Sequence, residues 1–148
     1  KLTAKRRAEL EAQIKARCRW GVGEASVAEI DRINILQATF LAMTRAVEAL
    51  GFEPAEVLVD GNRLPRWRYT ATAIIGGDAL HPCISAASII AKEHRDRFMV
   101  AVARDFPGFG WETNMGYGTA QHLAALRQHG PTPHHRTSFA PVAQMQLV

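Results

Sequence analysis

The chain has 148 residues, about the length of one domain, and 47% of them are hydrophobic, so it can bury a sizeable core and is not expected to be disordered. Lysine and arginine outnumber aspartate and glutamate by 18 to 14, which makes an anionic partner plausible but is too small an excess to identify one. The longest apolar run, residues 83–91, is too short and too rich in serine to span a bilayer, and no signal-peptide pattern is visible, so we expect a cytoplasmic protein.

The two cysteines, Cys18 and Cys83, form neither a Cys-x-x-Cys pair nor a cysteine–histidine spacing. A disulfide framework and a structural zinc site are therefore not indicated. We expect two buried thiols in a reducing compartment.

The first residues are predicted to form an amphipathic surface helix over residues 4–18, because apolar side chains recur four positions apart and charged ones fill the other positions. Thr3 stands where the helix cap belongs. Residues 19–25 look extended and are interrupted by glycine, and we predict a strand there.

Two further helices are predicted before the first apolar strand. Ser26 and Glu29 fit a capping box, in which each side chain satisfies a free backbone amide, so a short helix begins there. Residues 34–50 carry apolar side chains that step by four and three, and Gly51 follows where a left-handed cap ends a helix.

Two apolar runs each end in glycine and aspartate: residues 57–62 read Val-Leu-Val-Asp-Gly-Asn and residues 73–78 read Ala-Ile-Ile-Gly-Gly-Asp. A carboxylate directly after a buried strand must be solvated, hydrogen-bonded, paired or metal-bound. Hard cations such as Mg²⁺ or Mn²⁺ prefer carboxylate oxygens, so our hypothesis is that Asp60 and Asp78 share a metal site for phosphodiester chemistry. The competing interpretations are an Asx-turn at Asp60 and a helix cap at Asp78.

The direction of the two strands decides whether these carboxylates can meet. An antiparallel hairpin would put Asp60 and Asp78 at opposite ends, whereas parallel strands would put both at the edge where α/β sheets bind their ligands. Parallel crossovers normally take about a dozen residues or more, and the connection over residues 61–69 is shorter. An extended loop of that length can reach back roughly 30 Å, so the parallel arrangement is possible but demanding.

Pro82 is predicted to open a helix that runs to about Asp105. Lys92 lies on this helix and could reach a phosphate beside Ser88, but its spacing fits an exposed helix lysine equally well. The buried stripe of the helix is expected to comprise Ile84, Ala87, Ala91, His94, Phe98 and Val102.

The last third contains Tyr117 in a loop between two glycines, where its ring could stack on a sugar or base and its hydroxyl could bond a 2′-OH, although a packed surface aromatic is the common alternative. Thr119 is expected to cap a short helix that ends near Gln128. His134 and His135 lie in what we expect to be an exposed basic tail without strong structure, where neighbouring side chains point opposite ways, and we assign them no role.

Six stretches of the chain form a characteristic series of motifs. The longest is Ile-Ser-Ala-Ala-Ser-Ile-Ile-Ala-Lys at residues 84–92. The others are Glu-Ile-Asp-Arg-Ile-Asn-Ile-Leu at 29–36, Val-Asp-Gly-Asn at 59–62, Gly-Asp at 77–78, Gly-Tyr-Gly-Thr at 116–119 and His-His-Arg-Thr-Ser-Phe at 134–139. In their order, these motifs resemble those of the type 2 ribonucleases H, and in particular the bacterial ribonuclease HII group, which cleave the RNA strand of RNA/DNA hybrids. The stretch at residues 84–92 is similar to the family's Ile-Ser-Ala-Ala-Ser-Ile-x-Ala-Lys.

This resemblance implies an α/β fold, a ribonuclease H-like mixed sheet flanked by helices, in a single domain over residues 1–148. It implies an endoribonuclease that hydrolyses the RNA strand of RNA/DNA hybrids and ribonucleotides embedded in DNA, using Mn²⁺ or Mg²⁺. Asp60 and Asp78 would then be two of four metal-binding catalytic carboxylates, and Tyr117 would recognise the ribonucleotide next to a DNA residue. Lys92 would help to hold the substrate.

One family motif, Asp-Glu-x-Gly-Arg-Gly, which carries the other two carboxylates, does not occur in these residues. Residues 1–3, Lys-Leu-Thr, look like the end of the family's Asp-Ser-Lys-Lys-Leu-Ser/Thr motif. We therefore expect a domain incomplete at its N-terminus and a 148-residue chain that is inactive by itself. The alternative is a nucleic-acid-binding remnant without catalysis.

Overall fold

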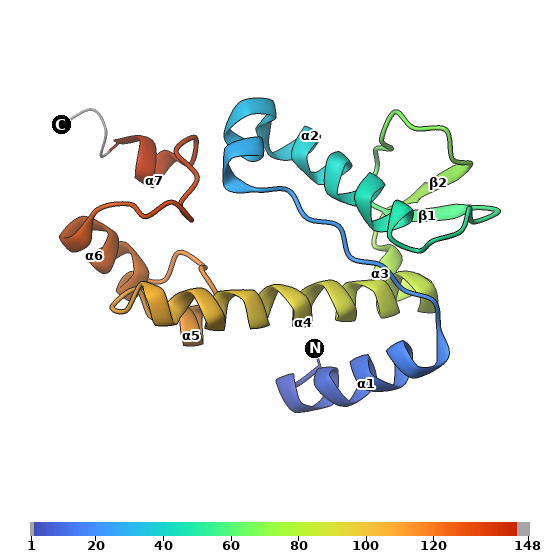
Figure 1. Cartoon of the computed structure of the whole chain (residues 1–148), viewed down its shortest axis with the longest axis horizontal. Helices are drawn as coiled ribbons and strands as arrows, with labels where there is room; N and C mark the ends of the chain where they lie inside the picture. The colour runs from blue at the N-terminus through green and yellow to red at the C-terminus, as the bar shows by residue number, and fades with distance from the viewer. Residues whose placement is uncertain (1, 145–148) are drawn as a thin grey trace. The chain divides into compact units, whose positions relative to one another are not determined.

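The computed structural model describes residues 2–144, so Lys1 of the motif at residues 1–3 lies outside the described part. By packing, the described chain divides into two compact units, one of residues 2–25 and 36–93 and one of residues 26–35 and 94–144. The single domain expected over residues 1–148 stays a prediction. The elements in chain order are α1 (Ala4–Arg17), α2 (Val27–Glu48), β1 (Val57–Asp60), β2 (Ala71–Ile74), α3 (Gly77–Leu80), α4 (Pro82–Asp105), α5 (Trp111–Asn114), α6 (Ala120–His129) and α7 (Ala140–Ala143) (Figure 1).

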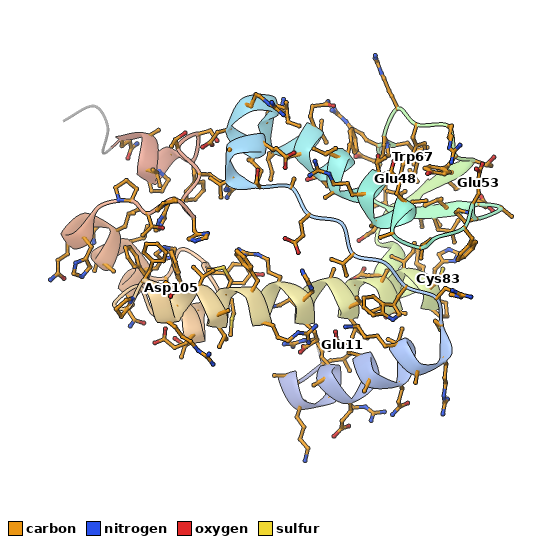
Figure 2. All side chains as sticks on the ribbon, viewed as in Figure 1. Glu11, Glu48, Glu53, Trp67, Cys83 and Asp105 are labelled. Atoms are coloured by element: carbon orange, nitrogen blue, oxygen red, sulfur yellow. The ribbon has the colours of Figure 1, made fainter. Side chains whose placement is uncertain are left out.

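Helix α1 confirms the predicted first helix and its cap, because the Thr3 hydroxyl accepts a hydrogen bond from the Arg6 N–H at 3.2 Å. Arg7 Nε donates to Glu93 Oε1 at 2.8 Å and so ties α1 to the first half of α4. Glu11, labelled in Figure 2, is buried on α1 and pairs with Lys15 at 2.7 Å.

The strand predicted over residues 19–25 is wrong, because this segment forms neither helix nor strand. A side chain on Gly21 would come within 2.6 Å of the Ala46 carbonyl oxygen, and one on Gly23 would overlap the backbone of Ala42 and Ala46. The glycines therefore serve close packing of an extended segment against small residues of α2, and no ladder of backbone hydrogen bonds is involved.

Helix α2 joins the two helices predicted after Ser26 and breaks at Asn34, whose φ of 67° is not helical. The capping box is confirmed, since the Ser26 N–H donates to Glu29 Oε2 at 2.8 Å and the Glu29 N–H donates to Ser26 Oγ at 3.2 Å. Gly51 has the left-handed φ of 75° expected after the helix end.

The two described strands are parallel, with Val57 opposite Ala71 and Asp60 opposite Ile74. The connection over residues 61–69 is short for a parallel crossover, but it does join two parallel strands. Figure 1 shows the two strands side by side, with β2 running into α3 and then α4. The α/β character of the chain is confirmed, and this sheet positions the candidate site.

Helix α4 has the predicted bounds, but its predicted buried stripe is only partly right. Ile84 and Val102 are buried, whereas Ala87, Ala91 and Phe98 are exposed. The first half of the helix packs in one unit and the second half in the other, so one continuous stripe does not describe both. The buried residues of α4 are Ile84, Ile89, Ile90, Glu93, Met99, Val102 and Ala103.

The expectation of buried thiols is wrong, because Cys18 and Cys83 are both exposed, and neither forms a disulfide. Cys18 is the C-cap of α1, and Cys83 is the second residue of α4 (Figure 2). Both thiols lie at an end of a helix and face solvent there.

The second unit is built on an aromatic core in which Trp111 is 2% exposed and stacks on Phe109 with ring centroids 5.0 Å apart. Val142 of α7 is 1% exposed and belongs to the same core, so the tail is more structured than we expected. The core comprises Met99, Val102, Ala103, Phe109, Trp111, Ala125, Leu126 and Val142. No helix within residues 2–144 is long and apolar enough to cross a membrane.

Asp31 anchors the C-terminal segment to the start of α2 within this unit. Its Oδ2 accepts from the Thr137 hydroxyl at 2.7 Å and the Thr137 N–H at 2.9 Å. Its Oδ1 accepts from the Ser138 hydroxyl at 2.7 Å and the Ser138 N–H at 3.1 Å. The two hydroxyls, more than any other group, hold the pKa of the Asp31 carboxyl well below its usual range, because all four donors favour its charged form.

A Gly23→Ala substitution should destabilise the first unit by about 2–4 kcal/mol, because the added methyl group overlaps backbone that cannot move aside. Gly118→Ala is the matched control, since a side chain there meets nothing within 4 Å, and its effect should stay within about 0.5 kcal/mol. Urea unfolding of the two variants and the parent measures the difference. Equal stability of both variants would contradict the close packing of Gly23 against α2.

Asp31→Asn should lower the stability of the second unit at pH 7 by about 1 kcal/mol, because an amide nitrogen would face donors where a carboxylate oxygen accepted. A lowered carboxyl pKa contributes stability that is present at pH values above the unfolded pKa and is lost as pH falls through the folded one. The difference between parent and variant should therefore be full at pH 7 and shrink below about pH 4. Asp105→Asn, at the exposed end of α4, should change the urea midpoint at neither pH (Figure 2).

Candidate active site

The first unit brings Asp60 and Asp78 to one edge of the parallel strand pair. Asp60 is the last residue of β1, and Asp78 lies in the first turn of α3, four positions after the end of β2. The backbone N–H of Gly77 donates to Asp60 Oδ1 at 2.9 Å, so Asp60 is linked directly to the residue before Asp78. Both aspartates are exposed. The metal site, the Asx-turn at Asp60 and the helix cap at Asp78 stay competing predictions.

Gly77 makes this approach possible. It is buried, and a side chain there would come within 2.5 Å of Ile84 Cδ1 and 3.5 Å of Asp60 Oδ1. A side chain at this position would require the Ile84 side chain to move, so glycine favours the close approach of α3 to α4. The Gly-Asp dipeptide at residues 77–78 therefore has a packing reason for its glycine.

The two carboxylates have the chemistry of a hard-cation site. Oδ1 of Asp60 accepts a hydrogen bond from the Gly77 N–H, which restricts the orientation of this carboxylate. Carboxylate oxygens are the ligands that Mg²⁺ and Mn²⁺ prefer. Among residues 2–144, no group of three or more histidine, cysteine, aspartate and glutamate side chains is placed to hold a metal.

Lys92 belongs to α4 within the same unit and is half-buried, one residue before the Glu93 that pairs with Arg7. Ser88 lies one helical turn earlier, and its hydroxyl donates to the Ser85 carbonyl at 2.8 Å. The half-buried stem of Lys92 distinguishes it from a fully solvated helix lysine.

Basic side chains of the β1–β2 connection also lie in the first unit. Arg63 and Arg66 line a groove together with apolar residues of α2, Leu36, Phe40 and Leu41. Arg68 instead pairs with Glu53 at 3.2 Å and covers the ring of Tyr69, which in turn packs edge-on against Trp67 at 5.4 Å (Figure 2). Arg68 and Tyr69 are thus engaged by nearby side chains of the same unit.

Tyr117 lies in the second unit, in a loop with unusual backbone geometry. Met115 and Gly116 both have left-handed φ angles, of 51° and 80°. Asn114 braces the turn, since its Nδ2 donates to the Phe109 carbonyl at 2.7 Å and its Oδ1 accepts from the Gly116 N–H at 2.9 Å. Tyr117 is 65% exposed.

The expectation that His134 and His135 form an exposed tail is wrong. His135 is 8% exposed, and its Nε2 lies 3.0 Å from Nε2 of the equally buried His122. His134 is half-buried and packs edge-on against Phe106. Desolvation by burial, together with the charges of His122 and His134, lowers the pKa of His135 to about 4, so this imidazole is neutral at pH 7.

The pairing of His122 with His135 leaves no periodic signal in the sequence. The two residues lie thirteen positions apart, one on a helix and the other in a loop. The one available cue was the Thr119 cap, whose hydroxyl accepts from the His122 N–H at 3.2 Å and fixes the position of His122 in the first turn of α6.

Comparison with known proteins identifies the family of the chain. The family model described as Ribonuclease HII matches residues 1–142. The chain is 84% identical to Ribonuclease HII of Sphingopyxis alaskensis over all of its residues and 75% of that protein, and 63% identical to Ribonuclease HII of Novosphingobium aromaticivorans over all of its residues and 81% of that protein.

The structural comparison points to the same fold. The crystal structure of the ribonuclease H2 from Pyrococcus horikoshii matches 99% of this chain and 78% of its own, with a TM-score of 0.77 at 22% sequence identity. The ribonuclease H-like fold expected from the sequence is confirmed. The chain therefore belongs to the ribonuclease HII family of divalent-metal-dependent endonucleases.

Proposed function

We propose that the protein hydrolyses the RNA strand of RNA/DNA hybrids and single ribonucleotides embedded in DNA, with Mg²⁺ or Mn²⁺ as the metal and Asp60 and Asp78 as catalytic ligands. The observation that carries this proposal is the parallel pairing of β1 and β2, which puts both carboxylates at one sheet edge in a member of a nuclease family. The cytoplasm is the proposed place of action, as the sequence led us to expect.

In the proposed reaction, the residues of this chain hold the metal ion and orient its ligands. Asp60 and Asp78 would supply carboxylate oxygens, and the Gly77 N–H fixes the orientation of the Asp60 carboxylate before any ligand arrives. A bound divalent cation would activate water and stabilise the oxygens of an in-line displacement at phosphorus. Because Gly77 packs against Ile84, the position of Asp60 depends on the first turn of α4 as well as on the sheet.

The substrate contacts are proposed for Lys92 and Tyr117. Lys92 carries a positive charge on a half-buried stem, which suits a phosphate of the duplex backbone. The exposed ring of Tyr117 suits stacking on a sugar or base, and its hydroxyl suits a 2′-OH, the group that distinguishes RNA from DNA. Arg63 and Arg66 add positive charge for the backbone of a nucleic acid.

Asp60→Asn and Asp78→Asn should each reduce cleavage of a duplex with one embedded ribonucleotide by about 100-fold or more, because each removes a charged metal ligand. The assay uses the protein as its gene encodes it, with Mg²⁺ and with Mn²⁺ and, as the metal-free arm, with EDTA. Asp105→Asn is the matched control and should cleave at the parental rate. Cleavage by the Asp60→Asn variant at the parental rate would exclude the proposed metal site, and duplex binding without cleavage by the parent would indicate the binding remnant.

Tyr117→Ala should lower kcat/KM for a single embedded ribonucleotide by about 5- to 100-fold, because stacking of an aromatic side chain on one base or sugar contributes about 1–3 kcal/mol. Tyr117→Phe keeps the ring and removes the hydroxyl, so the difference between the two variants measures the contribution of the hydroxyl. Steady-state cleavage of the same duplex provides both values. Parental activity of Tyr117→Ala would remove the proposed role of this residue.

A further inference from the structure

The backbone of Tyr117 is held by a buried histidine. Nδ1 of His122 lies 3.0 Å from the Tyr117 carbonyl oxygen. A carbonyl oxygen only accepts hydrogen bonds, so Nδ1 of His122 must carry the proton. The same carbonyl also accepts from the Thr119 N–H at 2.8 Å, so the first turn of α6 binds it twice.

The other nitrogen of His122 is consequently an acceptor when the ring is neutral. The indole N–H of Trp111 can only donate, and it points at His122 Nε2 from 3.2 Å. His135 Nε2 lies 3.0 Å from the same atom and must carry a proton to bond with it. The Trp111 and His135 donors both require an unprotonated Nε2 on His122, and therefore a proton on its Nδ1.

The far side of His135 agrees with this assignment. The Thr132 backbone N–H, which can only donate, lies 3.0 Å from His135 Nδ1, so Nδ1 is an acceptor and the proton of His135 is on Nε2. The Thr132 hydroxyl accepts from the His134 N–H at 3.2 Å and is free to donate to His135 Nδ1 at 3.0 Å. Among the described residues, every buried side-chain nitrogen and oxygen has a partner.

We propose that His122 is a positioning residue for Tyr117, held in its Nδ1–H tautomer by Trp111 and His135 so that it always presents a donor to the Tyr117 carbonyl. The proposal rests on the proposed function of Tyr117 in one respect only, namely that orienting Tyr117 matters for substrate choice. Tyr117 is 65% exposed, and the chain before it passes through two left-handed residues, where the backbone direction changes sharply, so a fixed backbone at Tyr117 helps to set the direction of its ring.

The chain of donors starts at Thr132 and ends at Tyr117. It therefore couples the C-terminal segment, which the neighbouring Asp31 also anchors through Thr137 and Ser138, to the loop that presents the ring. Moving the proton of either imidazole to its other nitrogen would set donor against donor and acceptor against acceptor, so the network has a single satisfied arrangement.

The first test reads the tautomers directly in the parent protein. Long-range ¹H–¹⁵N spectra at pH 7 should show a protonated Nδ1 on His122 and a protonated Nε2 on His135. The opposite tautomer on either ring would overturn the proposal, and this result does not depend on activity or on the role of Tyr117.

The second test uses two variants that each keep one end of the imidazole. His122→Asn keeps a donor near the Nδ1 position, and His122→Gln keeps an acceptor near Nε2 for Trp111 and His135 but loses the bond to Tyr117. His122→Gln should increase the motion of the Tyr117 amide in ¹⁵N relaxation and lower kcat/KM for a single embedded ribonucleotide about tenfold, mainly through KM. His122→Asn should restore most of both, and urea unfolding reports whether each variant is folded.

The outcomes separate the proposal from its alternatives. If both variants lose activity in proportion to stability, with no change in the motion of the Tyr117 amide, His122 has a purely structural role and the proposal is overturned. If the amide becomes mobile in His122→Gln while Tyr117→Ala cleaves like the parent, positioning holds and the proposed function of Tyr117 fails.

Discussion

The parallel pairing of β1 with β2 is the constraint on which the candidate site depends. Parallel strands end at the same edge, so the side chain that closes β1 and the turn that follows β2 are brought together whatever the rest of the chain does. The hydrogen bond from Gly77 to Asp60 then connects the two strand ends. A one-residue shift in register would turn the Asp60 side chain to the other face of the sheet and break this connection.

In the second unit, irregular segments are held against an aromatic core. Loops carry unpaired backbone groups that must be satisfied when they are buried. Side chains perform this task here: Asn114 braces the turn before Tyr117, Asp31 binds residues 137–138, and His135 binds Thr132. These contacts explain why the segment after α6 is ordered with little regular structure of its own.

Sequence patterns predicted the features that depend on neighbours along the chain. The caps at Thr3 and Thr119 and the capping box at Ser26 are local, and each was confirmed. The burial of His135 depends on residues far along the chain, and the packing of Gly23 depends on another helix. The predictions of an exposed tail at residues 134–135 and of a strand over residues 19–25 were therefore wrong. Local pattern left open whether Asp60 and Asp78 lie at the same sheet edge, because strand direction is decided by tertiary packing, which local propensity does not contain.

The same distinction explains why the resemblance to a family was more informative than periodicity. The Gly-Asp motif at residues 77–78 reflects a tertiary requirement, since Gly77 packs close to Ile84 and Asp78 follows at the sheet edge. The histidines at residues 134–135 reflect another such requirement, because His135 bonds to His122 and His134 packs edge-on against Phe106. The strings that matched the family motifs thus include residues that contact distant elements. In this chain these contacts are the close approach at Gly77 and the chain of hydrogen-bond donors that runs from Thr132 to Tyr117.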